Sequence, residues 1–167
     1  RNLIELALAN PQDSFIGLEL RYKRLVLAAK KIERQNIQNI LLMRERGQFI
    51  DEYLPHKSMD CMHINFPDPW SKKARRKHRI LSAEFLSKMH PHFRSKGELR
   101  FKTDHLEYFE TVTDILQDLK TYTIIEHTTD LHRSEYNENN ILTEFEMLFK
   151  SKENPPIGFL RAEVLQK

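Results

Sequence analysis

Apolar and polar positions alternate along the chain with two different periods, which predict strands and amphipathic helices in turn. Short apolar runs are typical of buried strands, and apolar residues at three- and four-residue spacing are typical of helices. Leu25, Ala28, Ala29 and Ile32 have this helical spacing, with Lys and Arg between them. The predicted strands are 14–20, 39–43, 59–66, 97–102, 122–125 and 157–165. The predicted helices are 1–10, 21–35, 48–54, one after Ser82, one after Asp104, and 143–150.

Strands and helices in this alternating order predict a doubly wound α/β fold. Right-handed crossovers then give a mostly parallel sheet with helices on both faces. Ligands of such sheets bind beyond the carboxyl ends of the strands, and Glu19, Glu45, Asp68 and Asp104 each follow a predicted strand. Asp104 is also the predicted N-cap of the next helix, as Ser82 is of another.

The strand 59–66 runs into the most unusual stretch of the chain, Pro67-Asp68-Pro69-Trp70. Two prolines with a fixed φ and no N–H group exclude both helix and further sheet pairing, so the loop is stiff. Six Lys or Arg residues follow among the eight residues 72–79. A basic segment next to an aromatic residue is typical of nucleic-acid binding, although each feature alone is more often structural.

Composition limits the remaining possibilities. The 167 residues, 40% hydrophobic and 31% charged, predict one globular domain over 1–167. The formal net charge is only +3, so the basic character is local. The single cysteine, Cys61, favours a reducing compartment, and no apolar run is long enough for a membrane helix, so we expect a cytoplasmic protein. The polar stretch 128–140 is predicted to be a surface loop.

Four sequence blocks together resemble one enzyme family. They are FPDPWSKK at 66–73, ARRKHR at 74–79, Lys102-Thr103-Asp104, and Thr143-Glu144-Phe145-Glu146. In their order and spacing, these blocks resemble the tRNA (guanine-N7-)-methyltransferases along nearly the whole chain. The resemblance implies a Rossmann-like class I methyltransferase fold, S-adenosylmethionine as cofactor, and methylation of the guanine at position 46 in the tRNA variable loop.

The resemblance also implies a role for each matching residue. It assigns Glu19, Glu45 and Asp68 to the cofactor, Lys72, Asp104, Thr143, Glu144, Phe145 and Glu146 to the substrate, and Lys73, Ala74, Arg75, Arg76, Lys77, His78 and Arg79 to RNA. We expect the protein to act on tRNA, as a monomer or a homodimer, without a membrane and without a metal ion.

The chemistry of guanine N7 is consistent with the residues in the loop. N7 has an in-plane lone pair and no proton, so methyl transfer needs alignment and no general base. Positive charge moves onto the purine, and the Asp68 carboxylate would stabilise it, which makes Asp68 the predicted catalytic residue. Glu19, after a strand of a dinucleotide-type fold, is predicted to accept hydrogen bonds from ribose hydroxyls.

Two departures from the family pattern leave alternatives open. The first strand and the glycine-rich loop, which would precede Arg1, are not part of the sequence, and Glu45-Arg46 stands where many relatives have Asp-Ala. Either an N-terminal segment is omitted or the cofactor does not bind in the usual way. The alternative function is therefore a non-catalytic RNA-binding remnant of the same fold. An NAD-linked oxidoreductase is the least favoured reading.

Overall fold

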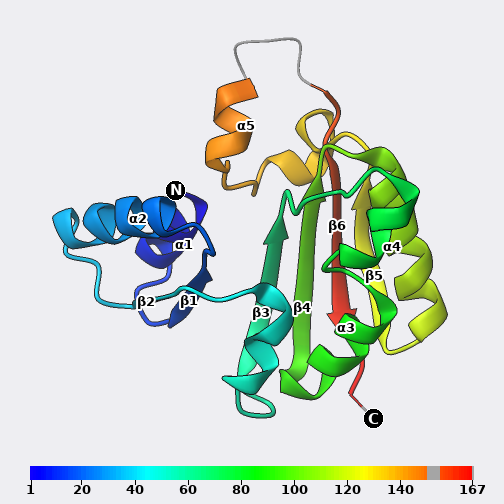
Figure 1. Cartoon of the computed structure of the whole chain (residues 1–167), viewed down its shortest axis with the longest axis horizontal. Helices are drawn as coiled ribbons and strands as arrows, with labels where there is room; N and C mark the ends of the chain where they lie inside the picture. Colours follow the sequence, from blue (N-terminus) through cyan, green and yellow to red (C-terminus); the bar gives the residue numbers. More distant parts are fainter. Residues whose placement is uncertain (150–154, 167) are drawn as a thin grey trace. The chain divides into compact units, whose positions relative to one another are not determined.

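The computed structural model describes residues 1–149 and 155–166, and its chain forms two compact units (Figure 1). The first unit comprises Arg1–Ile50 and Ile141–Glu153, and the second comprises Asp51–Asn140 and Asn154–Lys167. We describe each unit by itself. The single domain over 1–167 stays a prediction.

The first unit is built around a two-stranded parallel sheet. Its elements are α1 (Asn2–Ala9), β1 (Phe15–Leu18), α2 (Tyr22–Arg34), β2 (Ile40–Met43) and α5 (Glu144–Phe149). The sheet pairs Phe15 with Ile40 and Leu18 with Met43. At Gly17 a Cβ would lie 2.4 Å from the end of the Leu3 side chain, so a larger residue there would have to displace that side chain. The small core contains Ile4, Ala7 and Ile37, with Phe15, Ile32 and Ile40 packed against it.

The second unit contains a four-stranded sheet in the order β3-β4-β6-β5. Its elements are β3 (Met59–Asn65), α3 (Ala83–Met89), β4 (Phe93–Thr103), α4 (Leu106–Leu119), β5 (Tyr122–Thr128) and β6 (Gly158–Val164). β3 and β4 are parallel, whereas β6 lies antiparallel between β4 and β5. The last strand of the chain therefore enters the sheet interior, an arrangement that no local pattern in the sequence predicts.

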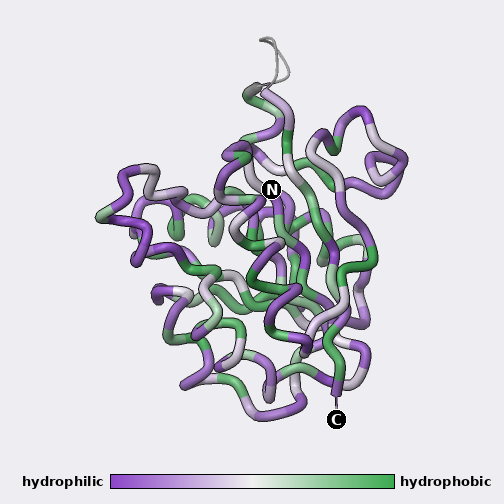
Figure 2. Tube along the Cα trace, turned by 90° about the vertical axis from the view of Figure 1, so that its right-hand side faces the viewer, coloured by the Kyte–Doolittle hydropathy of each residue, from purple (hydrophilic) through white to green (hydrophobic). Residues whose placement is uncertain are grey.

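Helices α3 and α4 pack on one face of this sheet (Figure 1). On β4, Leu99 and Phe101 are fully buried and alternate with the polar residues Glu98 and Arg100. On the polar side, Arg161 of β6 bonds to Glu98 at 2.6 Å and to Glu126 of β5, also at 2.6 Å. Figure 2 shows short hydrophobic and hydrophilic stretches that follow one another along the whole trace. The apolar side of the sheet and the two helices together form the main core.

The core of the second unit is completed by residues from both helices. Its fully or almost fully buried helical side chains are Phe85, Leu86, Met89, Tyr108, Phe109, Val112 and Leu116. The Tyr122 hydroxyl donates to the Leu86 carbonyl at 2.8 Å, which joins the first residue of β5 to the middle of α3. No helix among the described residues has both the length and the apolar character needed to cross a bilayer.

Most predicted elements are present, with changed ends. The strand predicted at 97–102 extends over Phe93–Thr103, and the helix predicted at 48–54 is a 3-10 helix, Gly47–Glu52. The loop predicted at 128–140 contains two 3-10 turns, Leu131–Arg133 and Glu135–Asn137. The end of the helix predicted at 143–150 lies outside the described residues.

One helix cap is as predicted and the other is wrong. The Ser82 hydroxyl accepts from the Phe85 N–H at 3.2 Å, which confirms Ser82 as the N-cap of α3. The N-cap of α4 is His105, because its ring Nδ1 accepts from the Tyr108 N–H at 3.2 Å. Asp104 lies one residue before the cap, so its carboxylate is not used to begin the helix.

Candidate active site

Two acids follow the carboxyl ends of the neighbouring strands β3 and β4. These strands are parallel and pair Asn65 with Lys102, and the Phe66 N–H donates to the Lys102 carbonyl at 2.8 Å. Asp68 follows β3 and Asp104 follows β4, and both are exposed. Neither carboxylate has a hydrogen bond or an ion pair with a described residue, so both are available to a ligand. The sheet thus brings together two of the predicted site residues.

The backbone around Asp68 is strained at two aromatic residues. Phe66 has φ 50° and Trp70 has φ 42°, in the left-handed region that bulky residues avoid. Each such residue costs on the order of 1–3 kcal/mol and persists only where its surroundings impose it. Phe66 packs against a buried cluster of Leu131, Ile157 and Phe159. We call Phe66–Ser71 the proline loop. The left-handed conformations of Phe66 and Trp70, near its two ends, were not predicted from the sequence.

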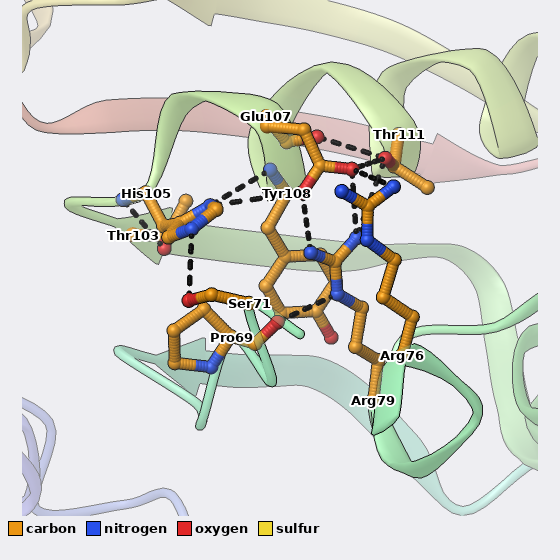
Figure 3. A network of polar contacts seen from close by, with 9 residues as sticks. All are labelled: Pro69, Ser71, Arg76, Arg79, Thr103, His105, Glu107, Tyr108 and Thr111. Carbon is orange, nitrogen blue, oxygen red and sulfur yellow. Dashed lines mark hydrogen bonds and ion pairs between the residues drawn. The ribbon is translucent and has the colours of Figure 1, made fainter. Parts of the chain in front are cut away.

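Helix α4 binds the other end of the proline loop through two polar contacts (Figure 3). The Arg79 Nε donates to the Pro69 carbonyl at 2.7 Å, and the same guanidinium bonds to Glu107 in the first turn of α4. The Ser71 hydroxyl lies 3.2 Å from Nε2 of His105. The loop that carries Asp68 is therefore attached to the first turn of α4 at both Pro69 and Ser71.

The basic segment, Lys72–Arg79, begins where the proline loop ends. Residues Lys73–His78 form a 3-10 helix, and all side chains from position 72 to 78 are exposed. Arg76 pairs with Glu107 at 3.0 Å. Four cations have no ion pair or hydrogen bond with a described residue: Lys72, Lys73, Arg75 and Lys77. The His78 ring lies 5.4 Å from the Trp70 ring, which places the end of this helix against the proline loop.

Arg79 differs from the rest of the basic segment. Its side chain is only 5% exposed and pairs with Glu107 at 2.5 Å, while the guanidinium carbon lies 4.5 Å from the centre of the Tyr108 ring. Hydrogen bonds from Arg79 hold the pKa of the Glu107 carboxyl below its usual range. The RNA contact expected of Arg79 stays a prediction, whereas the structure pairs its charge with Glu107 inside the second unit.

The first unit has a second pair of acids at a sheet edge. Leu18 pairs with Met43 in the parallel sheet, so Glu19 and Glu45 follow adjacent carboxyl ends. Glu19 accepts from the Arg21 N–H at 2.7 Å, and Glu45 accepts from the Arg46 N–H at 2.6 Å. Both acids are half-buried. Carboxylates at such an edge suit the hydroxyl groups of an adenosine ribose, so these residues fit the expected cofactor.

Arg46, the bulky cation beside Glu45, has an exposed side chain. The side chain of Arg44 is exposed too, and its guanidinium lies 5.9 Å from the centre of the Tyr22 ring.

The Thr143–Glu146 block begins helix α5. The Thr143 N–H donates to the Glu146 carboxylate at 2.7 Å, and the Glu146 N–H donates to the Thr143 hydroxyl at 3.1 Å. This reciprocal pair is a capping box, and Thr143 and Glu146 are both buried. Glu144 is exposed and pairs with Lys31 of α2 at 3.0 Å. The Thr-x-x-Glu spacing was a signal for the capping box that the sequence analysis did not use.

Other reactive groups do not form a second centre in the described part of the chain. Burial raises the pKa of the Cys61 thiol to about 11, so this side chain is protonated and a poor nucleophile at neutral pH. Among residues 1–149 and 155–166, no three His, Cys, Asp or Glu side chains gather in a way that could hold a metal ion.

Known proteins with a similar fold are methyltransferases. The crystal structure of the 16S rRNA methyltransferase KamB is similar in fold to this chain, with a TM-score of 0.67 and 15% sequence identity. The similarity covers 99% of this chain and 83% of the KamB chain. The fold is therefore that of a Rossmann-like class I methyltransferase. The family described as "Putative methyltransferase" matches residues 1–157.

Sequence relatives identify the family more closely. A bifunctional glycosyltransferase/methyltransferase of Fusobacterium nucleatum is 44% identical over 158 residues, which are 95% of this chain and 24% of that protein. A tRNA (guanine-N(7)-)-methyltransferase of Mycoplasma pneumoniae is 36% identical over 152 residues, which are 89% of this chain and 72% of that protein. The chain thus spans about a quarter of the first relative. It belongs to the tRNA (guanine-N(7)-)-methyltransferase family.

Proposed function

We propose that this protein transfers a methyl group from S-adenosylmethionine to N7 of a guanine in tRNA, at position 46 of the variable loop. The observation that carries the proposal is the exposed Asp68 on a stiff, strained loop, directly followed by an exposed basic helix. Membership of the family supports the same reaction, since relatives that match this chain over 72% and 70% of their own length are named for it. A purine acceptor and its phosphate backbone would thus meet neighbouring segments of one unit.

For this reaction the protein must align guanine N7 with the methyl group and stabilise the positive charge that forms on the purine. Guanine N7 has a lone pair in the ring plane and no proton to remove, so the protein needs no general base. The purine gains positive charge as the new N–CH₃ bond forms. A carboxylate held nearby favours that charged state, and the low mobility of the proline loop means that little reorganisation is needed. Asp68 is the catalytic residue in this proposal.

Guanine selection follows from the same carboxylate. Asp68 has acceptors for the N1–H and N2–H₂ donors of guanine, whereas adenine has no N2 amino group and no N1–H. Asp104, exposed on the neighbouring strand end, is the second proposed substrate contact. Lys72, four residues after Asp68, is the third. For the block formed by Thr143, Glu144, Phe145 and Glu146, the capping box supports a structural role beside the substrate contact that the family pattern implies.

The cofactor supplies a methyl group on a sulfonium sulfur. Glu19 and Glu45 are the proposed acceptors for its ribose hydroxyls, because these two acids follow adjacent parallel strands at their carboxyl ends. Asp68 is the proposed third contact. A ribose without a 2′-phosphate suits acidic partners, since a phosphate there would be repelled.

Affinity for tRNA would come mainly from the basic segment. The four cations Lys72, Lys73, Arg75 and Lys77 make no ion pair with a described residue, so phosphates can neutralise them without breaking existing contacts. We infer a cytoplasmic protein from this substrate. The alternative, a non-catalytic RNA-binding protein, shares the basic segment and predicts tRNA binding without product.

The test is to incubate the full-length protein with S-adenosylmethionine and a tRNA transcript, digest the RNA, and look for 7-methylguanosine by mass spectrometry. A transcript with adenosine in place of guanosine 46 should give no product. Asp68→Ala should abolish most of the product while Asp118→Ala, the same change at an exposed position on α4, should not. Binding of tRNA without any methylated product would favour the non-catalytic alternative.

A further inference from the structure

The basic segment has an internal division that its sequence does not show. Positions 72–78 are exposed, whereas Arg79, the last cation, is buried. A cation with 5% exposure cannot form a surface phosphate contact without leaving its present partners. Removing its ionic partner while it stays buried would be costly, which makes the arrangement around Arg79 a fixed feature of the fold.

All three nitrogens of the Arg79 guanidinium donate hydrogen bonds. Its Nε donates to the Pro69 carbonyl at 2.7 Å, and its terminal nitrogens donate to both oxygens of Glu107 at 3.3 and 2.5 Å and to the Thr111 hydroxyl at 3.5 Å. The face of the group lies over the Tyr108 ring. Such a planar, forked set of donors fixes both distance and orientation, which a lysine ammonium cannot reproduce.

The contact to Pro69 links this network to the reacting group. Pro69 lies between Asp68 and Trp70, and the Trp70 backbone is in the left-handed region with φ 42°. A hydrogen bond to this carbonyl therefore fixes the peptide between Pro69 and Trp70, one residue after Asp68. Figure 3 shows Arg79 between Pro69 on one side and Glu107 on the other.

A second contact acts on the same loop. Since Nδ1 of His105 accepts from the Tyr108 N–H, the proton of the neutral ring is on Nε2, which donates to the Ser71 hydroxyl. Glu107 also pairs with Arg76 of the basic helix at 3.0 Å. The start of α4 thus contacts the proline loop directly through His105 and, through Glu107, holds both Arg76 and the Arg79 that binds Pro69.

We propose that Arg79, held by Glu107, is a positioning residue that fixes the proline loop and thereby Asp68, and that it makes no contact with tRNA. The effect on the rate of methyl transfer rests on the proposed function. The contact that fixes the proline loop does not. Loss of the hydrogen bond to Pro69 lets the loop move, so transfer slows. Binding of tRNA, carried by the exposed cations, stays the same.

The main test uses Arg79→Lys, which keeps the charge and loses the forked geometry. Trp70 is the single tryptophan of the chain and lies in the proline loop, so its fluorescence reports on the loop directly. We expect acrylamide quenching of Trp70 to rise. At saturating tRNA the single-turnover rate should fall by about tenfold or more, since small misplacements of reacting groups have effects of up to about 100-fold. The dependence of tRNA affinity on salt should not change.

Arg94→Lys is the matched control. Arg94 also donates from Nε to a backbone carbonyl, that of Lys57 at 3.3 Å, and from a terminal nitrogen to a carboxylate, that of Asp60 at 2.9 Å. This network is exposed and does not include the proline loop. Arg94→Lys should leave Trp70 quenching and the transfer rate unchanged. Arg75→Ala, in contrast, should lower the salt slope of tRNA binding by about 0.7–0.9.

Each result decides between defined outcomes. A lower salt slope in Arg79→Lys, with unchanged Trp70 quenching, would show that Arg79 binds phosphate and overturn the proposal. Increased quenching in a protein whose wild type transfers no methyl group would support the loop contact and reject the proposed function instead. If Arg79→Lys does not fold, Ser71→Ala removes the exposed second contact. Ser71→Ala should raise the quenching of Trp70 and slow methyl transfer, as expected for Arg79→Lys. No change in either measurement would count against the proposal.

Discussion

The two sheet edges that carry acids differ in how their side chains are held. At the β3–β4 edge, Asp68 sits on a loop with two left-handed aromatic residues and contacts to α4. At the β1–β2 edge, Glu19 accepts from the backbone N–H two residues along the chain, and Glu45 accepts from the backbone N–H of the next residue. The contacts of the proline loop join distant parts of the unit, whereas these two hydrogen bonds are local.

This difference suits the two tasks that the proposed function gives to these acids, which are catalysis by Asp68 and cofactor recognition by Glu19 and Glu45. Catalysis depends on a carboxylate placed to within a fraction of an ångström, and long-range contacts provide that placement. Recognition of a ribose needs only acceptors at a suitable distance, and a flexible Glu side chain can adjust to it. Substitutions at the first edge should therefore affect rate, and substitutions at the second should affect cofactor affinity.

The largest expected effect is that of Asp68→Asn on the transfer rate. The amide keeps the size of the side chain but loses the charge and part of the acceptor capacity. We expect single-turnover methylation at saturating cofactor and tRNA to fall by orders of magnitude, with tRNA affinity in a filter-binding assay nearly unchanged. A variant with near-normal turnover would remove Asp68 from the mechanism and abolish the distinction between the two edges.

The next effect is that of Glu19→Ala on the cofactor. Removal of a charged acceptor from the ribose should cost roughly 1.5–3 kcal/mol, which is about 10–150-fold in dissociation constant. Isothermal titration with S-adenosylmethionine measures it, and the salt dependence of tRNA binding should be the same as in the wild type. Asp13→Ala, at an exposed acid before β1, is the control. Equal cofactor affinities in all three proteins would mean that Glu19 is a surface acid only.

The third prediction separates the basic segment from the cations of the first unit. The double variant Lys73→Ala, Lys77→Ala should flatten the plot of log affinity against log salt by about 1.4–1.8 units, because each phosphate contact contributes about 0.7–0.9. Lys23→Ala, Lys30→Ala removes the same charge from exposed positions on α2 and should leave the slope unchanged. Equal slopes for the two double variants would show that tRNA binding depends on the total charge of the protein and not on where the lysines lie.

The smallest expected effect is the pH dependence of the loop contact. Hydrogen bonds from Arg79 lower the pKa of Glu107 below the ordinary 4.5, so the contact stabilises the fold above about that pH. The stabilisation is lost as pH falls through the lower folded-state value. Acrylamide quenching of Trp70 should therefore rise at acid pH in the wild type.

Two substitutions distinguish this effect from general acid unfolding. Glu107→Gln should show raised Trp70 quenching already at neutral pH, with a smaller further rise on acidification. The pKa of Glu144 is also lowered, by its hydrogen bond with Lys31, but that pair lies in the first unit. Glu144→Gln should therefore follow the wild-type Trp70 profile. A Glu107→Gln profile identical to that of the wild type would contradict the assignment.

The sequence by itself determined the order of strands and helices and the chemical character of the loop. Apolar periodicity predicted the strands, Ser82 predicted a cap, and two prolines around Asp68 predicted a stiff loop, because these signals act within a few residues. The tertiary structure decided what depends on distant partners. Arg79 has the same charge as its neighbours, and only packing against Tyr108 and Glu107 buries it. In the same way, His105 and not Asp104 caps α4, since the end of β4 sets where the helix begins. The position of β6 between β4 and β5 likewise depends on pairing between segments far apart in the chain, which no local pattern encodes.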